Sequence, residues 1–272
     1  MANRNRGAAG DVPEPADARR ALVVFAAPDA GSEVAARAAR LADHLRAPLI
    51  RKRSEIPGAL TLRVDSEGLA LAVDGMEMQP DFTHLQARIK PQRLSRELLV
   101  QAVRIKDTPH PLVIDATAGL GEDSLILAAA GCRVELFEHD PVIAALLDDA
   151  LERAAREPAL APIAARMHLH EGDSTAALRT WTPAPDVVYL DPMFPARQKS
   201  AAVKKKFQLL HLLEQPCSDE RGLLEAALAA CPRKIVIKRP AKGPVLAGLA
   251  PAYSRSGKSI RFDVLIPAQL PR

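Results

Sequence analysis

The chain has 272 residues, of which 48% are hydrophobic and 26% are charged, and this composition is typical of a folded globular protein. It argues against a disordered, collagen-like or coiled-coil protein, and the longest apolar runs are too short to span a bilayer. Lys and Arg number 37 against 33 Asp and Glu, which gives a net charge of +4. This mild excess permits an anionic partner such as nucleic acid but does not require one.

The cysteines predict a reduced, cytoplasmic location. Cys132, Cys217 and Cys231 are odd in number and widely spaced, so neither a disulfide framework nor a zinc cluster is predicted. The histidines show no metal-ligand spacing, and no metal is expected. Residues 1–19 have no continuous apolar segment, and we expect a disordered leader rather than a secretory signal.

Residues 20–85 predict a small α/β subdomain. A short apolar run at 22–25 precedes a helix whose apolar residues recur at helical spacing, and strand-like segments follow at 48–50, 60–64 and 69–73. An amphipathic helix between Leu94 and Val103 is expected to link this subdomain to the rest of the chain. The basic residues that flank this helix are Lys90, Arg93, Arg96, Arg104 and Lys106.

Residues 86–272 predict a larger α/β domain in which strands and helices alternate. The strands are expected at 112–116, 133–138, 167–170, 187–191, 234–238 and near 261–266, and the helices at 123–130, 141–155, 174–179 and 222–230. Such alternation predicts a mostly parallel sheet with helices on both faces. In such sheets ligands bind at the carboxyl ends of the strands.

The first strand of this domain ends at Asp115 and runs into a turn that contains Gly119 and Gly121. Glycines there allow a ligand to approach the backbone. Glu122 and Asp123 occupy the start of the next helix, where they would repel the pyrophosphate of a dinucleotide. They suit S-adenosylmethionine instead, because it carries an ammonium and a sulfonium group. The alternative is that both carboxylates only complement the helix dipole.

Acidic residues also follow the next two strands. Glu138 stands where it can accept both hydroxyls of a ribose, and His139 is expected in the pocket wall. Asp140 precedes a proline and is assigned to capping the next helix. Asp173, with Ser174 beside it, either accepts from an adenine amino group or caps the following helix, and both interpretations stay open.

The fourth strand ends in the sequence Asp-Pro-Met-Phe-Pro at 191–195. An acid or amide, a proline, any residue and an aromatic are similar to the signature of methyltransferases that act on exocyclic amines. Asp191 and the carbonyl of Pro192 can accept the hydrogens of such an amine, and Phe194 can stack on the base. Met193 departs from the second proline of that signature. The alternative is a proline turn with a core phenylalanine.

A run of cations follows this motif, with five in ten residues and no acid among them. The run consists of Arg197, Lys199, Lys204, Lys205 and Lys206. Such a run is usually a solvated face. Beside a base-binding loop, we expect it to contact RNA phosphates together with Lys238 and Arg239, which end a later strand.

Taken together, these segments resemble the small-subunit (16S) ribosomal RNA guanine-N2 methyltransferases of the RsmJ type. The resemblance is carried by residues 115–121, 141–149, 187–195, 198–205, 238–240 and 261–263. It implies a class I, Rossmann-like S-adenosylmethionine-dependent methyltransferase fold with a small N-terminal α/β subdomain. It also implies methylation of the N2 amine of one guanine near the 3′ end of that RNA.

Carried over by position, the resemblance implies a donor site with four parts. These are Glu122 with Asp123, Glu138 with His139, Asp173 with Ser174, and Asp191. The implied partner is small-subunit ribosomal RNA or the subunit particle, and the sequence leaves the choice between them and the oligomeric state open.

Two alternative functions remain. Another exocyclic-amine methyltransferase, acting on DNA adenine or protein glutamine, would share the Asp-Pro-x-Phe loop. A catalytically silent RNA-binding assembly factor would keep the fold and the basic face. A nicotinamide oxidoreductase ranks last, because Ser124 stands where a dinucleotide site has its third glycine and the helix start is acidic.

Overall fold

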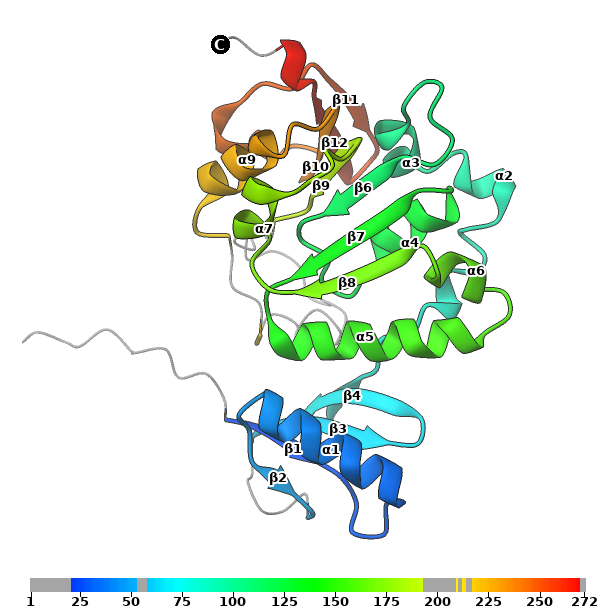
Figure 1. Cartoon of the computed structure of the whole chain (residues 1–272), viewed down its shortest axis with the longest axis vertical. Helices are drawn as coiled ribbons and strands as arrows, with labels where there is room; N and C mark the ends of the chain where they lie inside the picture. The colour runs from blue at the N-terminus through cyan, green and yellow to red at the C-terminus, as the bar shows by residue number, and fades with distance from the viewer. Residues whose placement is uncertain (1–20, 53–57, 193–208, 210–211, 214–216, 270–272) are drawn as a thin grey trace, which may run out of the picture.

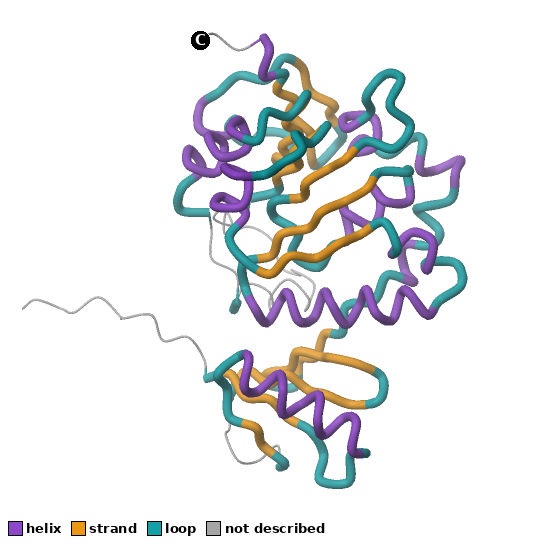
Figure 2. Tube along the Cα trace, in the orientation of Figure 1, coloured by secondary structure: helices purple, strands orange, loops and turns teal. Residues whose placement is uncertain are grey.

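The computed structural model describes residues 21–52, 58–192, 209, 212–213 and 217–269, and the predicted leader at 1–19 lies outside this range. The chain forms two β-sheets with helices against them (Figures 1 and 2). None of the described helices is long and apolar enough to cross a membrane.

The first sheet is built from the N-terminal part of the chain. Its elements are β1 (Leu22–Phe25), α1 (Ser32–His44), β2 (Leu49–Ile50), β3 (Leu60–Asp65), β4 (Gly68–Val73) and β5 (Met76–Met78). The strand order is β2-β1-β3-β4-β5, with β1 parallel to β2 and β3 and the remaining pairs antiparallel. In β3 buried residues alternate with partly exposed ones, which is the pattern of a strand covered on one face.

The prediction of a single linking helix between Leu94 and Val103 is wrong. The chain instead forms the short helices η2 (Thr83–Leu85), α2 (Pro91–Leu94) and α3 (Leu98–Val103). Glu97 has an extended backbone, with φ −64° and ψ 125°, and its carboxylate accepts hydrogen bonds from Arg88 Nε at 2.6 Å and Nη2 at 2.8 Å. This ion pair accompanies the break in the helix, at the N-cap residue directly before α3.

The second sheet confirms the predicted fold class. Its strands are β6 (Leu112–Asp115), β7 (Arg133–Glu138), β8 (Met167–Glu171), β9 (Val187–Leu190), β10 (Lys234–Pro240), β11 (Tyr253–Ser256) and β12 (Ile260–Leu265). The order is β11-β12-β10-β9-β6-β7-β8, and only the pairs that involve β12 are antiparallel. The strand order reverses between β9 and β6, which is where such sheets bind ligands.

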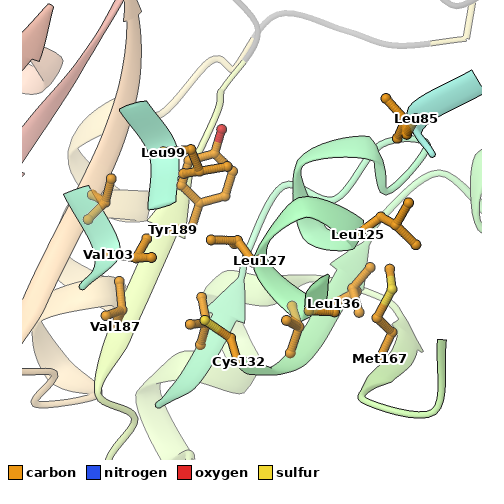
Figure 3. Packing of buried hydrophobic residues seen from close by; sticks show 14 of the residues in the cluster. Leu85, Leu99, Val103, Leu125, Leu127, Cys132, Leu136, Met167, Val187 and Tyr189 are labelled. Carbon is orange, nitrogen blue, oxygen red and sulfur yellow. The ribbon is translucent and has the colours of Figure 1, made fainter. Parts of the chain in front are cut away.

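Helices cover both faces of this sheet. They are α4 (Glu122–Ala129), α5 (Pro141–Arg156), α6 (Ala161–Ala164), α7 (Ser174–Thr180) and α9 (Glu220–Ala229), followed by the short helices η3 (Leu246–Gly248) and η4 (Pro267–Gln269). On one face α3 and α4 form a core against β9, where Leu99 and Leu127 pack near Tyr189 and Val187 (Figure 3). On the other face α7 and α9 pack against the same sheet.

The long helix α5 lies between the two sheets (Figure 1). Leu147 and Ala150 belong to the core of the second sheet, whereas Ile143 and Leu146 are buried in the core of the first. The helix is therefore apolar on two faces. The predicted domain boundary between residues 85 and 86 stays a prediction.

A buried carboxylate on α5 joins the two parts. Asp149 is 1% exposed and forms ion pairs with Arg37 of α1 at 2.8 Å and with Arg153 at 2.9 Å. Arg153 also donates to the carbonyl of Pro80. Gly68 begins β4 at φ +118°, where a Cβ atom would lie 2.6 Å from Asp149 Oδ2. The close approach of β4 to this carboxylate therefore requires glycine.

We expect Asp149→Ala to lower the free energy of unfolding by about 3 kcal/mol, because it leaves two arginines without their buried partner. Urea unfolding followed by circular dichroism measures this loss. Glu152→Ala is the matched control, because Glu152 is half-exposed and pairs with Arg37 at 3.3 Å, and it should cost less than about 1 kcal/mol. Equal losses in the two variants would contradict the role given to Asp149.

Candidate functional site

The carboxyl ends of β6, β7 and β9 and the start of α7 surround a cavity of about 540 Å³. This volume is in the usual range for a small-molecule site. The predicted site residues that line it are Gly119, Glu138, His139, Asp173, Ser174, Asp191 and Pro192. The structure therefore brings residues from four separate segments of the chain together.

A larger cavity, of about 880 Å³, lies at the opposite end of the same sheet. Its lining is mainly apolar, as at Leu94, Val103 and Cys132. We assign the candidate site to the smaller cavity, because it lies at the carboxyl ends of parallel strands and gathers several carboxylates.

Asp115 does not line the cavity but lies behind it. Its buried carboxylate accepts hydrogen bonds from Ser124 Oγ at 2.5 Å and from the Thr117 amide at 3.1 Å. Burial raises the pKa of Asp115 to about 7, although both hydrogen bonds oppose this. Asp115 therefore fixes the turn that follows β6 through the Thr117 amide, and it joins this turn to α4 through the Ser124 hydroxyl.

The two glycines of this turn have different roles. The amide of Gly119 donates to Glu138 Oε2 at 2.8 Å, at the wall of the cavity. Gly121 precedes α4 at φ +72°, and a Cβ atom there would meet Leu147 Cδ1 at 2.6 Å. Gly119 thus lines the cavity, where the predicted approach of a ligand to its backbone stays a prediction, whereas Gly121 allows α4 to pack against α5.

Glu138 is held in place by backbone amides. Gly119 donates to Oε2, and Asp140 donates to Oε1 at 2.8 Å. Burial raises the pKa of Glu138, and these hydrogen bonds oppose the shift. A carboxylate has about four acceptor positions, so two amides leave room for hydroxyl donors. The predicted capping by Asp140 is confirmed, because its side chain accepts from the amides of Val142 and Ile143.

Asp173 caps α7 and also lines the cavity. Its carboxylate accepts from the Thr175 amide at 2.8 Å and from the Thr175 hydroxyl at 2.7 Å. The hydrogen bond from the hydroxyl is the main cause that lowers the pKa of Asp173. The capping interpretation is confirmed, and it leaves the carboxylate at the cavity wall beside Ser174.

Asp191 is joined to a chain of polar groups. Its amide donates to Thr117 Oγ1 at 2.6 Å, and its Oδ2 accepts from Lys238 Nζ at 2.8 Å. The same ammonium donates to Asp123 Oδ2 at 2.8 Å, and that oxygen also accepts from the Tyr189 hydroxyl at 2.7 Å. Lys238 of β10 therefore bridges Asp191, which follows β9, and Asp123, which lies in the first turn of α4.

The opposite charges of Lys238 and the two carboxylates stabilise each other's ionised forms. Burial lowers the pKa of Lys238, but the carboxylates of Asp123 and Asp191 outweigh it and hold that pKa above its ordinary value. Burial raises the pKa of Asp191, and the ammonium opposes this. No donor among the described residues reaches Asp191 Oδ1, and the side chain is 36% exposed. Among the described residues, one oxygen of Asp191 is thus held by Lys238 and the other has no hydrogen-bond donor.

Glu122 and Asp123, which the sequence predicts to contact the donor, are not among the residues that line the cavity, and their contact with the donor stays a prediction. Asp123 is engaged by Lys238 and Tyr189. Glu122 Oε1 lies 3.4 Å from His84 Nε2, on the side of α4 that faces η2. The acidic start of α4 is therefore satisfied by the protein's own side chains.

The structure corrects the predicted RNA contact of Arg239. This side chain is wholly buried, and its Nε donates to the carbonyl of Pro244 at 2.7 Å. A phosphate has no access to it in this arrangement. Lys238, predicted for the same role, bridges Asp123 and Asp191, and its contact with RNA stays a prediction. The remaining predicted residues, Phe194, Arg197, Lys199, Lys204, Lys205 and Lys206, lie outside the described residues.

Thr117 and the segment before α9 line the cavity although the sequence had not predicted them there. Thr117 lies in the turn between Asp115 and Gly119, so its place in the motif was a usable signal. Cys217, Ser218 and Asp219 line the far side of the cavity. They belong to no motif, and only the N-cap that Asp219 forms on α9 could have been predicted from the sequence.

Comparisons with known proteins agree with this fold. A family model described as a putative SAM-dependent methyltransferase matches residues 50–267. The solved structure of an SAM-dependent methyltransferase from Neisseria gonorrhoeae superposes with a TM-score of 0.71 at 34% identity, over 92% of this chain and 97% of that one.

Two relatives carry the name ribosomal RNA small subunit methyltransferase J. The protein from Thioalkalivibrio sulfidiphilus is 44% identical over 252 residues, which are 87% of this chain and 95% of that protein. The protein from Neisseria gonorrhoeae is 44% identical over 206 residues, which are 75% of this chain and 82% of that protein. The chain therefore belongs to the ribosomal RNA small subunit methyltransferase J family of S-adenosylmethionine-dependent methyltransferases.

Proposed function

We propose that the protein methylates the exocyclic N2 amine of a specific guanine in small-subunit (16S) ribosomal RNA, with S-adenosylmethionine as methyl donor. Two relatives named ribosomal RNA small subunit methyltransferase J are similar in sequence over most of this chain, and they support the reaction and the class of RNA. The observation that carries the proposal is Asp191, because it lines the cavity at the end of β9 and its Oδ2 is held by Lys238.

The cavity has the chemistry that the donor needs. The open acceptor positions of Glu138 suit the two ribose hydroxyls, and Asp173 suits the amino group of adenine. Phe137 adds an apolar wall to the same cavity. The carboxylates also suit a ligand that carries positive charge. When bound, S-adenosylmethionine supplies an electrophilic methyl group on a cationic sulfur.

The amine of guanine is a weak nucleophile, because its lone pair is delocalised into the ring. Asp191 Oδ1 and the carbonyl of Pro192 are proposed to accept hydrogen bonds from the two N–H groups of this amine. These hydrogen bonds would turn the nitrogen lone pair toward the methyl group of S-adenosylmethionine. The hydrogen bond from the Asp191 amide to Thr117 and the ion pair with Lys238 fix the carboxylate for this task. Stacking of the base by Phe194 stays a prediction.

The wider proposal concerns organisation and location. We propose that residues 20–85 and 86–272 are a small N-terminal subdomain and the methyltransferase domain. The partner is proposed to be ribosomal RNA, free or in a subunit particle. All three cysteines are free thiols, which suits the proposed cytoplasmic location.

We expect Asp191→Ala to lower kcat for methyl transfer by about 100-fold or more, because the amine loses the group that orients it. The dissociation constant for S-adenosylmethionine, measured by calorimetry, should change far less. Glu171→Ala is the matched control, because this carboxylate also ends a strand of the sheet but does not line the cavity. Normal turnover by Asp191→Ala would contradict the proposed role.

Lys238→Met should move the acidic limb of the pH–rate profile to higher pH. The ammonium lowers the pKa of Asp191, so its removal raises that pKa, and the carboxylate then forms only at higher pH. Lys238→Arg keeps the charge and should shift the limb less. Initial rates measured across pH at saturating substrates give the profiles. An unshifted limb in Lys238→Met would mean that this lysine does not tune Asp191.

A further inference from the structure

A second groove, positively charged, lies on the face of the sheet that α3 covers. It has a volume of about 320 Å³. Its lining residues are Arg88, Arg93, Arg96, Glu97, Leu98, Ile260 and Phe262. Neither the methyl donor site nor the proposed base contact uses any of these residues, and we call this feature the arginine groove.

The arginine groove opens near the same edge of the sheet as Asp191. Phe262 pairs with Lys238 across β12 and β10, and Lys238 holds Asp191. The pKa of Arg88 is raised chiefly by its hydrogen bonds to Glu97, and the charges of Asp123 and Glu122 add to this. Lys238 therefore neighbours one residue of the groove, Phe262, and one residue of the cavity, Asp191.

The groove has an excess of positive charge. Arg88 binds both carboxylate oxygens of Glu97, so these two charges compensate each other. Arg93 and Arg96 are exposed, and no carboxylate among the described residues forms an ion pair with either side chain. Two guanidinium groups are thus left for an external anion.

The hairpin of β11 and β12 extends this charged surface. Arg255 pairs with Phe262 across the two strands, so both side chains lie on the same face of the sheet. The turn that follows β11 packs against the groove, because a Cβ atom on Gly257 would lie 3.0 Å from Leu98 Cδ1. Lys258 in this turn is exposed, as is Arg255.

We propose that the arginine groove binds backbone phosphates of the substrate RNA next to the target guanine. Guanidinium groups match phosphate oxygens in charge and in geometry. A base that enters a catalytic pocket leaves its stack, and the flanking backbone has to be held at the rim of that pocket. This inference rests on the proposed function, because it takes RNA as the substrate.

The test compares two double variants with equal changes in charge. Arg93→Gln/Arg96→Gln removes the free guanidiniums of the groove, and Arg104→Gln/Lys106→Gln removes two exposed cations beyond the other end of α3. The probe is an unmodified transcript of the 3′ part of small-subunit ribosomal RNA. Filter binding at several salt concentrations gives the dissociation constants, and calorimetry with S-adenosylmethionine reports whether the donor site is intact.

The groove variant should bind the transcript about tenfold more weakly, with a slope of log affinity against log salt reduced by about 2. The control variant should bind like the wild type, and both should keep their affinity for S-adenosylmethionine. An unchanged RNA affinity in the groove variant, or an equal loss in the control, overturns the inference.

Methyl transfer by the wild-type protein, measured on the same transcript, separates this inference from the proposed function. Transfer to guanine with unchanged RNA binding by the groove variant would leave the function standing and remove the groove. A selective loss of binding without any wild-type transfer would support the groove and count against the function.

Discussion

The ammonium of Lys238 between Asp123 and Asp191 is the interaction on which the site depends. Two carboxylates approach one edge of the sheet there; burial and the charge of Asp123 raise the pKa of Asp191, and the ammonium opposes this. The bridge holds Oδ2 of Asp191, a residue that lines the cavity. Lys238 also pairs across the strands with Phe262, which lines the arginine groove, so the same lysine neighbours both features.

The surrounding fold serves mainly to hold this edge in place. Asp115 and Glu138 accept backbone amides from the turn after β6, so buried carboxylates organise the loop that lines the cavity. Gly121 lets α4 approach α5, and Asp149 of α5 binds Arg37 in the N-terminal sheet. The N-terminal part is thereby tied, through one helix, to the sheet that carries the site.

Much of this arrangement was predictable, because it depends on local patterns. Apolar runs gave most strands of the second sheet, and Asp140 before a proline gave a helix cap. The edge strand β11 was missed because its sequence, Tyr-Ser-Arg-Ser, has no apolar alternation. The break before α3 is accompanied by an ion pair between Arg88 and Glu97, which are nine residues apart, and no helical period signals this pairing.

What the sequence did not reveal at the site is contact between segments that are far apart in the chain. Arg239 and Lys238 are adjacent and both basic, yet one is buried against Pro244 and the other bridges two acids. Asp123 was assigned to the ligand because its charge was readable, whereas its partner lies 115 residues away. Charge patterns predict which groups meet at an edge, but not which of them satisfy each other.

A labelling experiment measures whether the protein transfers methyl groups to the N2 amine of guanine. Small-subunit ribosomal RNA without modifications is incubated with the protein and S-adenosylmethionine labelled in the methyl group, and the product is digested to nucleosides. We expect the label in N2-methylguanosine. Label in another nucleoside would contradict the assigned target, and no label would contradict the proposed reaction on RNA.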